Sequence, residues 1–209
     1  MKNIIIIDYG CGNLLNLSRA IEFIGQRAEV TRDKDKIINA THLILPGVGA
    51  FKKAMEKLEQ LGLKTSIKEY TKQKKPLLGI CLGMQLLFSK SFEFGSHAGL
   101  DLIEGEVIKL KSKDKNVKIP HIGWNEIYPK FTNDNSKKIF TEDLYGKNFY
   151  FIHSFIGISK KKEKTNGFAE YMNISIPAFV SSENTFGCQF HPEKSGRNGI
   201  KLLKNFCNL

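Results

Sequence analysis

The chain has 209 residues, of which 41% are hydrophobic and 25% charged, and its formal net charge is +11 at pH 7. These values are typical of one globular domain, residues 1–209, that can bury a full core. The N-terminal apolar run Ile4–Ile7 is too short for a signal peptide or a membrane span, so we expect a cytoplasmic protein with no membrane association.

Short apolar segments alternate with amphipathic ones through the first half of the chain. Buried strands are expected at Ile4–Ile7, 43–45 and Leu77–Ile80. Between them, apolar residues recur at helical spacing over 14–24 and again over 51–61, which predicts two helices. This alternation predicts an α/β fold with an open, mainly parallel sheet flanked by helices.

Strand patterns without intervening helices begin near Val107. They are expected at 107–110, 126–128, 149–152, 168–171, 178–180 and 186–190. Glycine, asparagine and lysine turns separate these segments, which predicts an antiparallel extension of the sheet. A last amphipathic helix is expected over 199–207.

The segment Gly79-Ile80-Cys81-Leu82-Gly83 joins a predicted strand to a predicted helix. Glycines on both sides of Cys81 permit the sharp turn of a nucleophile elbow. At the first turn of a helix, unpaired N–H groups and the positive end of the dipole favour the thiolate, and the Leu82 N–H can donate to a developing oxyanion. The alternative is that Cys81 is a small buried core residue.

A histidine and a carboxylate in Gln189-Phe190-His191-Pro192-Glu193 favour the catalytic interpretation of Cys81. His191 is the predicted base, and Glu193 is predicted to orient it. His153 competes for the role of base but has no carboxylate two residues away. His42 and His97 have no supporting context and are expected at the surface.

Pro46-Gly47-Val48-Gly49 follows the second predicted strand, at the carboxyl edge where open α/β sheets bind ligands. Its two glycines allow main-chain N–H groups to approach a substrate closely. We therefore expect a further oxyanion donor at Val48 or Gly49; the alternative is a plain strand-to-helix turn. The run from Asp8 to Asn13 lacks the third glycine of a dinucleotide-binding loop, so a Rossmann cofactor site is rejected.

Lysines are concentrated at 109–118 and 160–164. A nucleic-acid footprint would add interleaved aromatic residues and arginines, so these runs are interpreted as solvated turns, and nucleic-acid binding is not favoured. The four cysteines form neither a CxxC pair nor a metal-ligand spacing. They are predicted to be reduced thiols, and we expect no metal and no cofactor.

Together these segments resemble the class I glutamine amidotransferases, and within that family the glutaminase subunits of imidazole glycerol phosphate synthases. The matching runs are Asp8-Tyr9-Gly10-Cys11-Gly12-Asn13-Leu14, Pro46-Gly47-Val48-Gly49, Gly79-Ile80-Cys81-Leu82-Gly83-Met84-Gln85, Pro120-His121-Ile122-Gly123-Trp124-Asn125 and Gln189-Phe190-His191-Pro192-Glu193-Lys194-Ser195. They span nearly the whole chain. The resemblance implies a flavodoxin-like α/β fold.

By this resemblance, Cys81 attacks the side-chain amide of L-glutamine and forms a glutamyl thioester while ammonia leaves. His191 transfers the protons and Glu193 orients it. The family's substrate-binding and oxyanion positions fall on Val48, Gly49, Leu82, Gln85, Ser154 and Phe155.

The resemblance also implies a heterodimer with a cyclase-type (β/α)8-barrel synthase subunit, which docks over the site and receives ammonia for histidine biosynthesis. Exclusion of water would keep that ammonia unprotonated and nucleophilic. Asn13, Trp124 and Lys194 match positions near this interface. Docking is expected to reorient the 47–48 region and to raise glutamine hydrolysis.

Three residues depart from the usual family pattern: Ile122 replaces a methionine, Asp101 a glycine and Phe155 a tyrosine. A paralogous subunit that supplies ammonia for amidation of a nucleotide sugar in surface polysaccharide synthesis therefore remains an alternative. A non-catalytic binding module with a basic surface is disfavoured because nucleophile, base and carboxylate are all present. A cysteine peptidase is disfavoured by the Pro46-Gly47-Val48-Gly49 and Trp124 segments.

Overall fold

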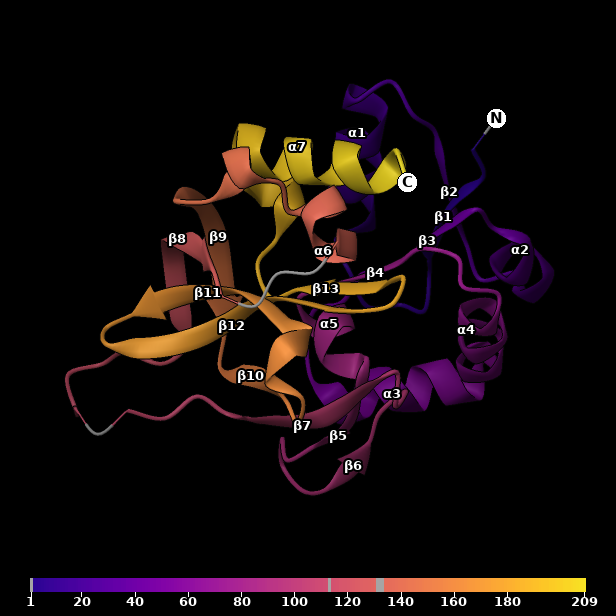
Figure 1. Ribbon diagram of the computed structural model, residues 1–209. Coiled ribbons are helices and arrows are strands. Elements are labelled where there is room, and N and C mark those ends of the chain that lie inside the picture. Colours follow the sequence, from indigo (N-terminus) through magenta and orange to yellow (C-terminus); the bar gives the residue numbers. More distant parts are fainter. Residues whose placement is uncertain (1, 113, 131–133) are drawn as a thin grey trace.

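A nine-stranded mixed sheet crosses the molecule in this computed structural model, which describes residues 2–112, 114–130 and 134–209 (Figure 1). Lys113, part of the lysine-rich 109–118 run, lies outside the described residues. The strands lie in the order β2 (Ala28–Thr31), β1 (Ile4–Ile7), β3 (His42–Leu45), β4 (Leu77–Ile80), β13 (Thr185–Cys188), β12 (Ile174–Ser182), β11 (Thr165–Tyr171), β8 (His121–Pro129) and β9 (Lys147–His153). The first five pair in parallel and the rest antiparallel, so the predicted mainly parallel core with an antiparallel extension is confirmed.

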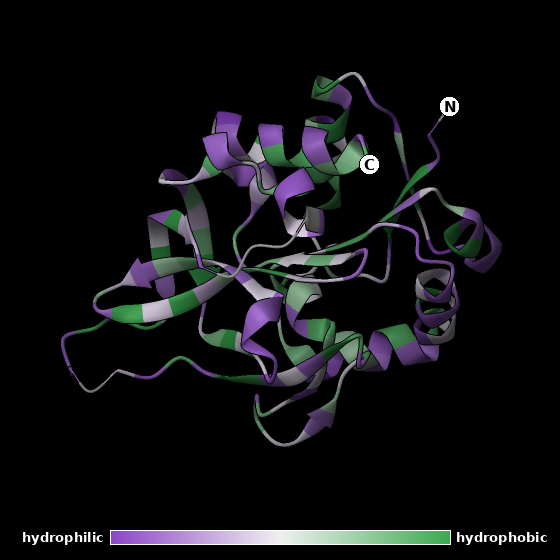
Figure 2. Cartoon of the chain, in the orientation of Figure 1, coloured by the Kyte–Doolittle hydropathy of each residue, from purple (hydrophilic) through white to green (hydrophobic). Residues whose placement is uncertain are grey.

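Helices cover both faces of the parallel half. On one face lie α1 (Leu14–Phe23) and α7 (Gly196–Cys207); on the other lie α3 (Phe51–Gln60), α4 (Leu63–Lys72) and α5 (Leu82–Leu86) (Figure 1). Alternate residues of β1 serve the two layers, because successive strand side chains point to opposite faces. The apolar sides of these helices turn toward the sheet (Figure 2). This double cover explains why the strands read as unbroken apolar runs.

A second, four-stranded sheet lies beside the main one, in the order β10 (Phe155–Ser159), β7 (Ile103–Lys109), β5 (Phe88–Ser91) and β6 (His97–Ala98). The expectation that 107–110 extends the main sheet is wrong, because β7 pairs in parallel with β5 and antiparallel with β10. A strand pattern defines a pleated, half-buried segment but not the neighbour it pairs with.

Short elements complete the chain: α2 (Lys34–Asn39), α6 (Asp134–Ile139), η1 (Glu142–Leu144), η2 (Lys162–Lys164) and η3 (Pro192–Lys194). Helix α6 interrupts a region expected to contain strands only. His42 is buried against Phe206 rather than exposed, with ring centroids 5.5 Å apart. Asp101 has φ +57°, the left-handed conformation in which glycine is favoured, which accounts physically for the glycine common there in the family.

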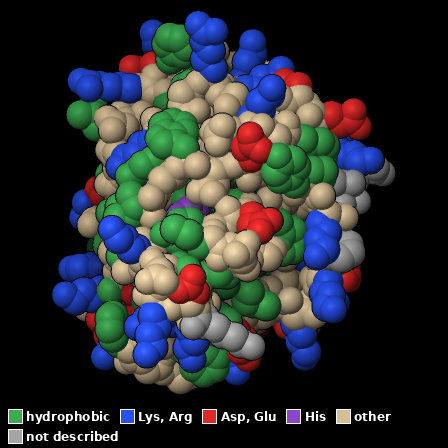
Figure 3. Space-filling model, turned by 90° about the vertical axis from the view of Figure 1, so that its left-hand side faces the viewer, with side chains coloured by type: hydrophobic (Ala, Val, Ile, Leu, Met, Phe, Trp, Pro, Cys, Tyr) green, Lys and Arg blue, Asp and Glu red, His purple; other side chains and the backbone are tan. Residues whose placement is uncertain are grey.

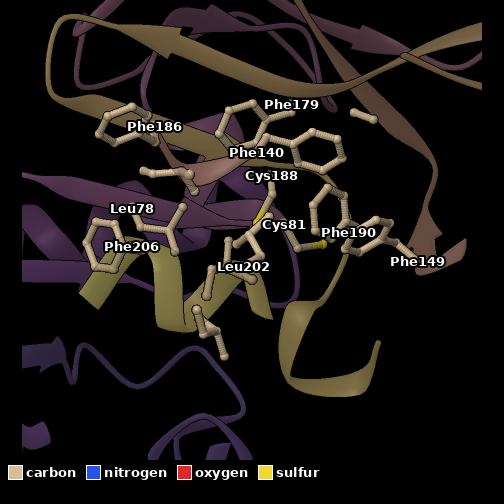
Figure 4. Close-up of a cluster of buried hydrophobic side chains, with 14 of the residues drawn as sticks. Leu78, Cys81, Phe140, Phe149, Phe179, Phe186, Cys188, Phe190, Leu202 and Phe206 are labelled. Atoms are coloured by element: carbon tan, nitrogen blue, oxygen red, sulfur yellow. The ribbon is translucent and has the colours of Figure 1, made fainter. Parts of the chain in front are cut away.

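An aromatic cluster fills the space between α7 and the sheet (Figure 4). Phe149 and Phe190 lie 4.4 Å apart between ring centroids, and Phe140 packs beside both. Cys81 lies at the margin of this cluster, close to Phe190 in the close-up (Figure 4). The elbow therefore packs directly against the hydrophobic core.

Within the described ranges, no helix is long and apolar enough to cross a membrane. The same residues contain no group of three or more histidine, cysteine or acidic side chains that would suit a metal ion. All four cysteines are free thiols.

Candidate active site

Cys81 occupies the turn between β4 and α5 with φ +54° and ψ −108°. A non-glycine residue in such a conformation costs about 1–3 kcal/mol and persists only where its surroundings enforce it. The flanking glycines are required by close packing: a Cβ on Gly83 would lie 1.8 Å from the Leu45 carbonyl oxygen, and one on Gly79 would lie 2.7 Å from the Gly83 carbonyl oxygen. The local sequence therefore builds the sharp turn that the elbow pattern predicts.

The His191 ring and the Glu193 carboxylate form a buried pair in front of the elbow. Nδ1 of His191 lies 2.8 Å from Oε1 of Glu193, and both side chains are 3% exposed. Nε2 of His191 has no hydrogen-bond partner among the described residues. His191 and Cys81 line one cavity, so the structure brings the three predicted catalytic side chains together.

Electrostatics favour a proton on His191. Burial lowers the pKa of the imidazole, but the neighbouring Cys81 side chain and the Glu193 carboxylate outweigh burial and raise the pKa to about 10. A positive ring beside the sulfur stabilises a thiolate. The arrangement therefore suits a thiolate–imidazolium pair.

Gln189 completes the surroundings of the sulfur, although the sequence analysis assigned it no role. Its Nε2 lies 3.8 Å from Cys81 Sγ, and its Oε1 accepts a hydrogen bond from Gln85 Nε2 at 3.0 Å. Gln85 Nε2 also donates to the Phe155 carbonyl at 3.0 Å. The side chain of Gln85, 5% exposed, is thus tied to the Ser154–Phe155 wall of the cavity.

One of the predicted oxyanion donors, the elbow amide, is occupied in this conformation. The Leu82 N–H donates to the Gly47 carbonyl at 3.3 Å. Val48 and Gly49 line the cavity, and Gly49 has φ +104°, a conformation that favours glycine. The elbow amide would become available only if the Gly47 carbonyl moved away.

The cavity has a volume of about 310 Å³, large enough for an amino acid. Its lining residues are Val48, Gly49, Cys81, Leu82, Gln85, Glu93, Ile152, His153, Ser154, Phe155, His191 and Lys194. Glu93 was not predicted from sequence: it is buried, and its Oε2 accepts a hydrogen bond from the Phe51 N–H at 2.5 Å. A glutamate in Ser-Phe-Glu-Phe-Gly carries no recognisable signal until the fold places it in the cavity that Cys81 lines.

His153 also lines the cavity, yet its surroundings disfavour the role of base. Its Nε2 lies 3.0 Å from Nδ1 of His121, and its Nδ1 lies 3.0 Å from the Phe155 carbonyl oxygen. Burial, followed by the nearby His121, lowers the pKa of His153 to about 3. Both nitrogens are occupied and the ring is neutral, so His191 is the better candidate.

Exposed apolar side chains surround the mouth of the cavity. Register pairs Ile122 with Ile152 and Trp124 with Tyr150 across β8 and β9, so these four side chains share one face. Trp124 is 54% exposed, and the Lys194 Nζ lies 5.8 Å from the Tyr150 ring centroid. On the corresponding face, hydrophobic side chains border a hollow with a histidine at its base (Figure 3).

Asn13 lies on the opposite side of the triad, at the start of α1. Its side chain makes no capping hydrogen bond. It lines a narrow gap with Val48, His191 and Glu193, and Lys194 lines the cavity that contains Cys81. Trp124 lines neither space; its ring lies 5.7 Å from that of Tyr150, the ring that Lys194 also approaches.

A larger cleft of about 610 Å³ lies at the amino ends of β4 and β13, the edge of the sheet opposite to the elbow. It is lined mainly by asparagines, with Lys138 as its one ionisable side chain. Size alone would select this cleft, but its described lining residues include no catalytic nucleophile or base, so the smaller cavity is the candidate active site.

Comparisons with known proteins agree with this geometry. The family model for class I glutamine amidotransferases matches residues 5–209. A protein of Moorella thermoacetica described as imidazole glycerol phosphate synthase subunit HisH is 46% identical over 209 residues, covering 100% of this chain and 96% of the relative. A Wolinella succinogenes protein of the same description is 43% identical and covers 98% of each chain.

Two solved structures show the same fold. The structure of PurLQS from Thermotoga maritima matches with a TM-score of 0.73 at 19% identity, covering 100% of this chain and 99% of that chain. The glutaminase domain of Trypanosoma brucei CTPS, with bound acivicin, matches with a TM-score of 0.66 at 13% identity, covering 100% of this chain and 94% of that one.

Proposed function

This chain belongs to the class I glutamine amidotransferases, and from that membership we propose that it is the single-domain glutaminase subunit of an imidazole glycerol phosphate synthase. It hydrolyses L-glutamine to glutamate and ammonia, and supplies the ammonia to histidine biosynthesis. The observation that carries the chemistry is that Cys81 and His191 line one cavity while Glu193 binds the far nitrogen of the His191 ring.

The reaction begins with a thiolate on Cys81 and a proton on His191, the state that the raised pKa of His191 favours. The sulfur attacks the side-chain carbonyl carbon of glutamine, giving a tetrahedral oxyanion. The C–N bond then breaks, and His191 gives its proton to the leaving nitrogen, which departs as ammonia. His191 next removes a proton from water, which attacks the thioester and releases glutamate from Cys81. Glu193 holds the imidazole through Nδ1 during both steps.

The rest of the cavity suits the amino-acid end of glutamine. We assign its carboxylate to the backbone of Ser154 and Phe155, with Gln85 and Gly49 completing that wall. The cationic amine of glutamine requires a carboxylate, and the carboxylate that lines this cavity belongs to Glu93. Glu93 is therefore our candidate for the amine site.

The state of the oxyanion side supports a gated enzyme. For the Leu82 N–H to reach the tetrahedral oxyanion, the Gly47 carbonyl must leave it. Gly49 provides the conformational freedom for such a movement. We assign the trigger to docking of the partner, whose predicted surface includes Asn13, Trp124 and Lys194.

The partner is a cyclase-type (β/α)8-barrel synthase subunit that binds over the cavity mouth to form a heterodimer. The exposed apolar side chains of β8 and β9 form the hydrophobic centre of that surface. The similarity to subunits of imidazole glycerol phosphate synthase favours the histidine pathway over amidation of a nucleotide sugar. No cofactor is needed for this chemistry, and we expect the protein in the cytoplasm.

The test of this function is Cys81→Ala in the assembled heterodimer. Glutamine-dependent synthesis should be lost, while synthesis driven by added ammonium salt continues at the wild-type rate, since only the nucleophile is removed. Retained glutamine hydrolysis would exclude Cys81 as the nucleophile. Failure of the chain to assemble with the cyclase subunit, or to restore growth of a histidine auxotroph with it, would exclude the proposed pathway.

A further inference from the structure

Helix α3 lacks a cap of its own. Its N-cap residue is Ala50, which has no side-chain oxygen, and its first turn contains no acidic residue. The first helical N–H, that of Phe51, is instead bound by Glu93 Oε2 at 2.5 Å. A carboxylate at the positive end of a helix dipole is a favourable cap, here supplied by a segment 42 residues away in the chain.

This cap lies at one end of the segment from Pro46 to Ala50. At the other end, the buried Tyr9 hydroxyl donates to the Pro46 carbonyl at 2.7 Å. Between the ends, the Gly47 carbonyl accepts from the Leu82 N–H at 3.3 Å, a longer hydrogen bond than the two end contacts. The hydrogen bonds at the two ends of the segment are thus shorter than the one in its middle.

Gly49 lies between the Gly47 carbonyl, which accepts from Leu82, and the cap formed by Glu93. Its φ of +104° strains any other residue, and a Cβ there would meet no atom within 4 Å. The glycine is therefore required by backbone conformation and not by crowding. When the residues after Gly49 stay fixed, a rotation at Gly49 redirects the amides of Val48 and Gly49 relative to the cavity.

We propose that Glu93 is a positioning residue for the oxyanion hole: by capping α3 through the Phe51 N–H, it fixes the point about which Pro46–Ala50 turns when Gly47 releases Leu82. This inference rests on the proposed glutaminase function. Because the same carboxylate faces the cavity, one side chain contacts the amine end of the substrate and holds the peptide segment that receives its amide oxygen.

Two substitutions separate the cap from the charge. Glu93→Gln keeps an acceptor oxygen at the same reach but loses the negative charge. Glu93→Asp keeps the charge, but its carboxylate is one methylene short of the Phe51 N–H. Kinetics are measured on the heterodimer with glutamine. Glu93→Gln should raise KM with kcat within about 2-fold of wild type, whereas Glu93→Asp should lower kcat by about 10-fold or more, as expected for a misplaced catalytic group.

A second measurement follows the cap without any turnover. Hydrogen exchange of the free chain reports opening of the first turn of α3. Exchange at residues 50–54 should accelerate in Glu93→Asp and stay near wild type in Glu93→Gln. Asp33→Ala is the matched control, because Asp33 caps α2 through the Lys36 N–H at 3.0 Å and lies outside the cavity lining. It should accelerate exchange in α2 and leave kcat unchanged.

Equal kcat in Glu93→Gln and Glu93→Asp would overturn the proposal and leave Glu93 as an amine ligand only. Unchanged exchange at 50–54 in Glu93→Asp would overturn it independently of turnover. If the wild-type heterodimer hydrolysed no glutamine, the proposed function would fail, while the exchange result would still decide whether Glu93 caps the segment.

Discussion

The two sides of the active-site cavity differ in whether their functional groups are already in place. On the nucleophile side, Cys81, His191 and Glu193 are assembled, buried and backed by the aromatic core. On the oxyanion side, the Leu82 N–H donates to the Gly47 carbonyl, and Gly49 has the positive φ that gives the glycine-rich segment its conformational freedom. The difference teaches that the triad side chains are already in place while the elbow amide still depends on a movement of the Gly47 carbonyl.

The largest expected effect comes from breaking the assembled side. His191→Asn should lower kcat of the heterodimer for glutamine by about 10³–10⁴-fold, since the variant has no group to carry the proton. Steady-state assays of ammonia release measure it, with ammonia-dependent synthesis as the control. A loss below 10-fold would move the role of base to another group, and His153→Asn would then be the variant to compare.

A side chain added within the elbow should lower the free energy of unfolding more than it lowers affinity for the partner. Gly83→Ala places a Cβ within 1.8 Å of the Leu45 carbonyl oxygen, so β3 or α5 must shift. We expect about 3 kcal/mol of destabilisation in urea unfolding. Gly25→Ala is the control: its φ is +77° with no atom within 4 Å of the new Cβ, so the cost is backbone strain of about 1 kcal/mol. Equal costs would mean that the elbow is not closely packed.

Partner docking can be weakened without touching either side of the cavity. Trp124→Ala removes an exposed aromatic anchor and should weaken heterodimer affinity by about 2 kcal/mol, roughly 30-fold, with basal hydrolysis unchanged. Phe23→Ala provides the control, because Phe23 is 79% exposed at the end of α1 and has no place in the predicted interface. Isothermal titration measures both; a loss shared by the two variants would argue against a specific surface at β8.

The smallest effect, per pH unit, concerns the pH dependence of stability. The pKa values of the two cavity histidines are shifted in opposite directions. The pKa of His191 is raised to about 10, so its contribution to stability is complete below pH 6.5 and is lost as pH rises toward 10. The pKa of His153 is lowered to about 3, so its contribution is present above pH 6.5 and is lost as pH falls toward 3. His153→Asn should reduce the acid-limb slope by up to about 1.4 kcal/mol per pH unit. An unchanged acid limb would place that titration elsewhere.

The sequence was most informative where one local pattern dictates the structure. The apolar runs of β1, β3 and β4 predict strands because only strands buried on both faces match such a pattern. The glycines around Cys81 predict the sharp turn because its close packing leaves no room for a side chain. His191 and Glu193 were predictable as partners because they lie two residues apart. The family resemblance then placed them opposite the elbow.

Other features depend on contacts between distant segments and left no local signal. Pairing of β7 with β5 and β10 is a choice among neighbours, which strand periodicity does not encode. Glu93 and Gln189 acquire their roles only when β5, β13 and the elbow meet. The hydrogen bond from Leu82 to Gly47 likewise depends on the rotation of a single peptide segment, which no residue type specifies.

The most direct test compares glutamine hydrolysis by the free chain with hydrolysis by the heterodimer carrying its nucleotide ligand, using alkylation of Cys81 by iodoacetamide in the free chain as a reference for the thiolate. The account predicts rapid alkylation at neutral pH, slow hydrolysis by the free chain, and an increase of about 100-fold or more on docking, the scale of one oxyanion donor. Equal hydrolysis rates with and without the partner would contradict it.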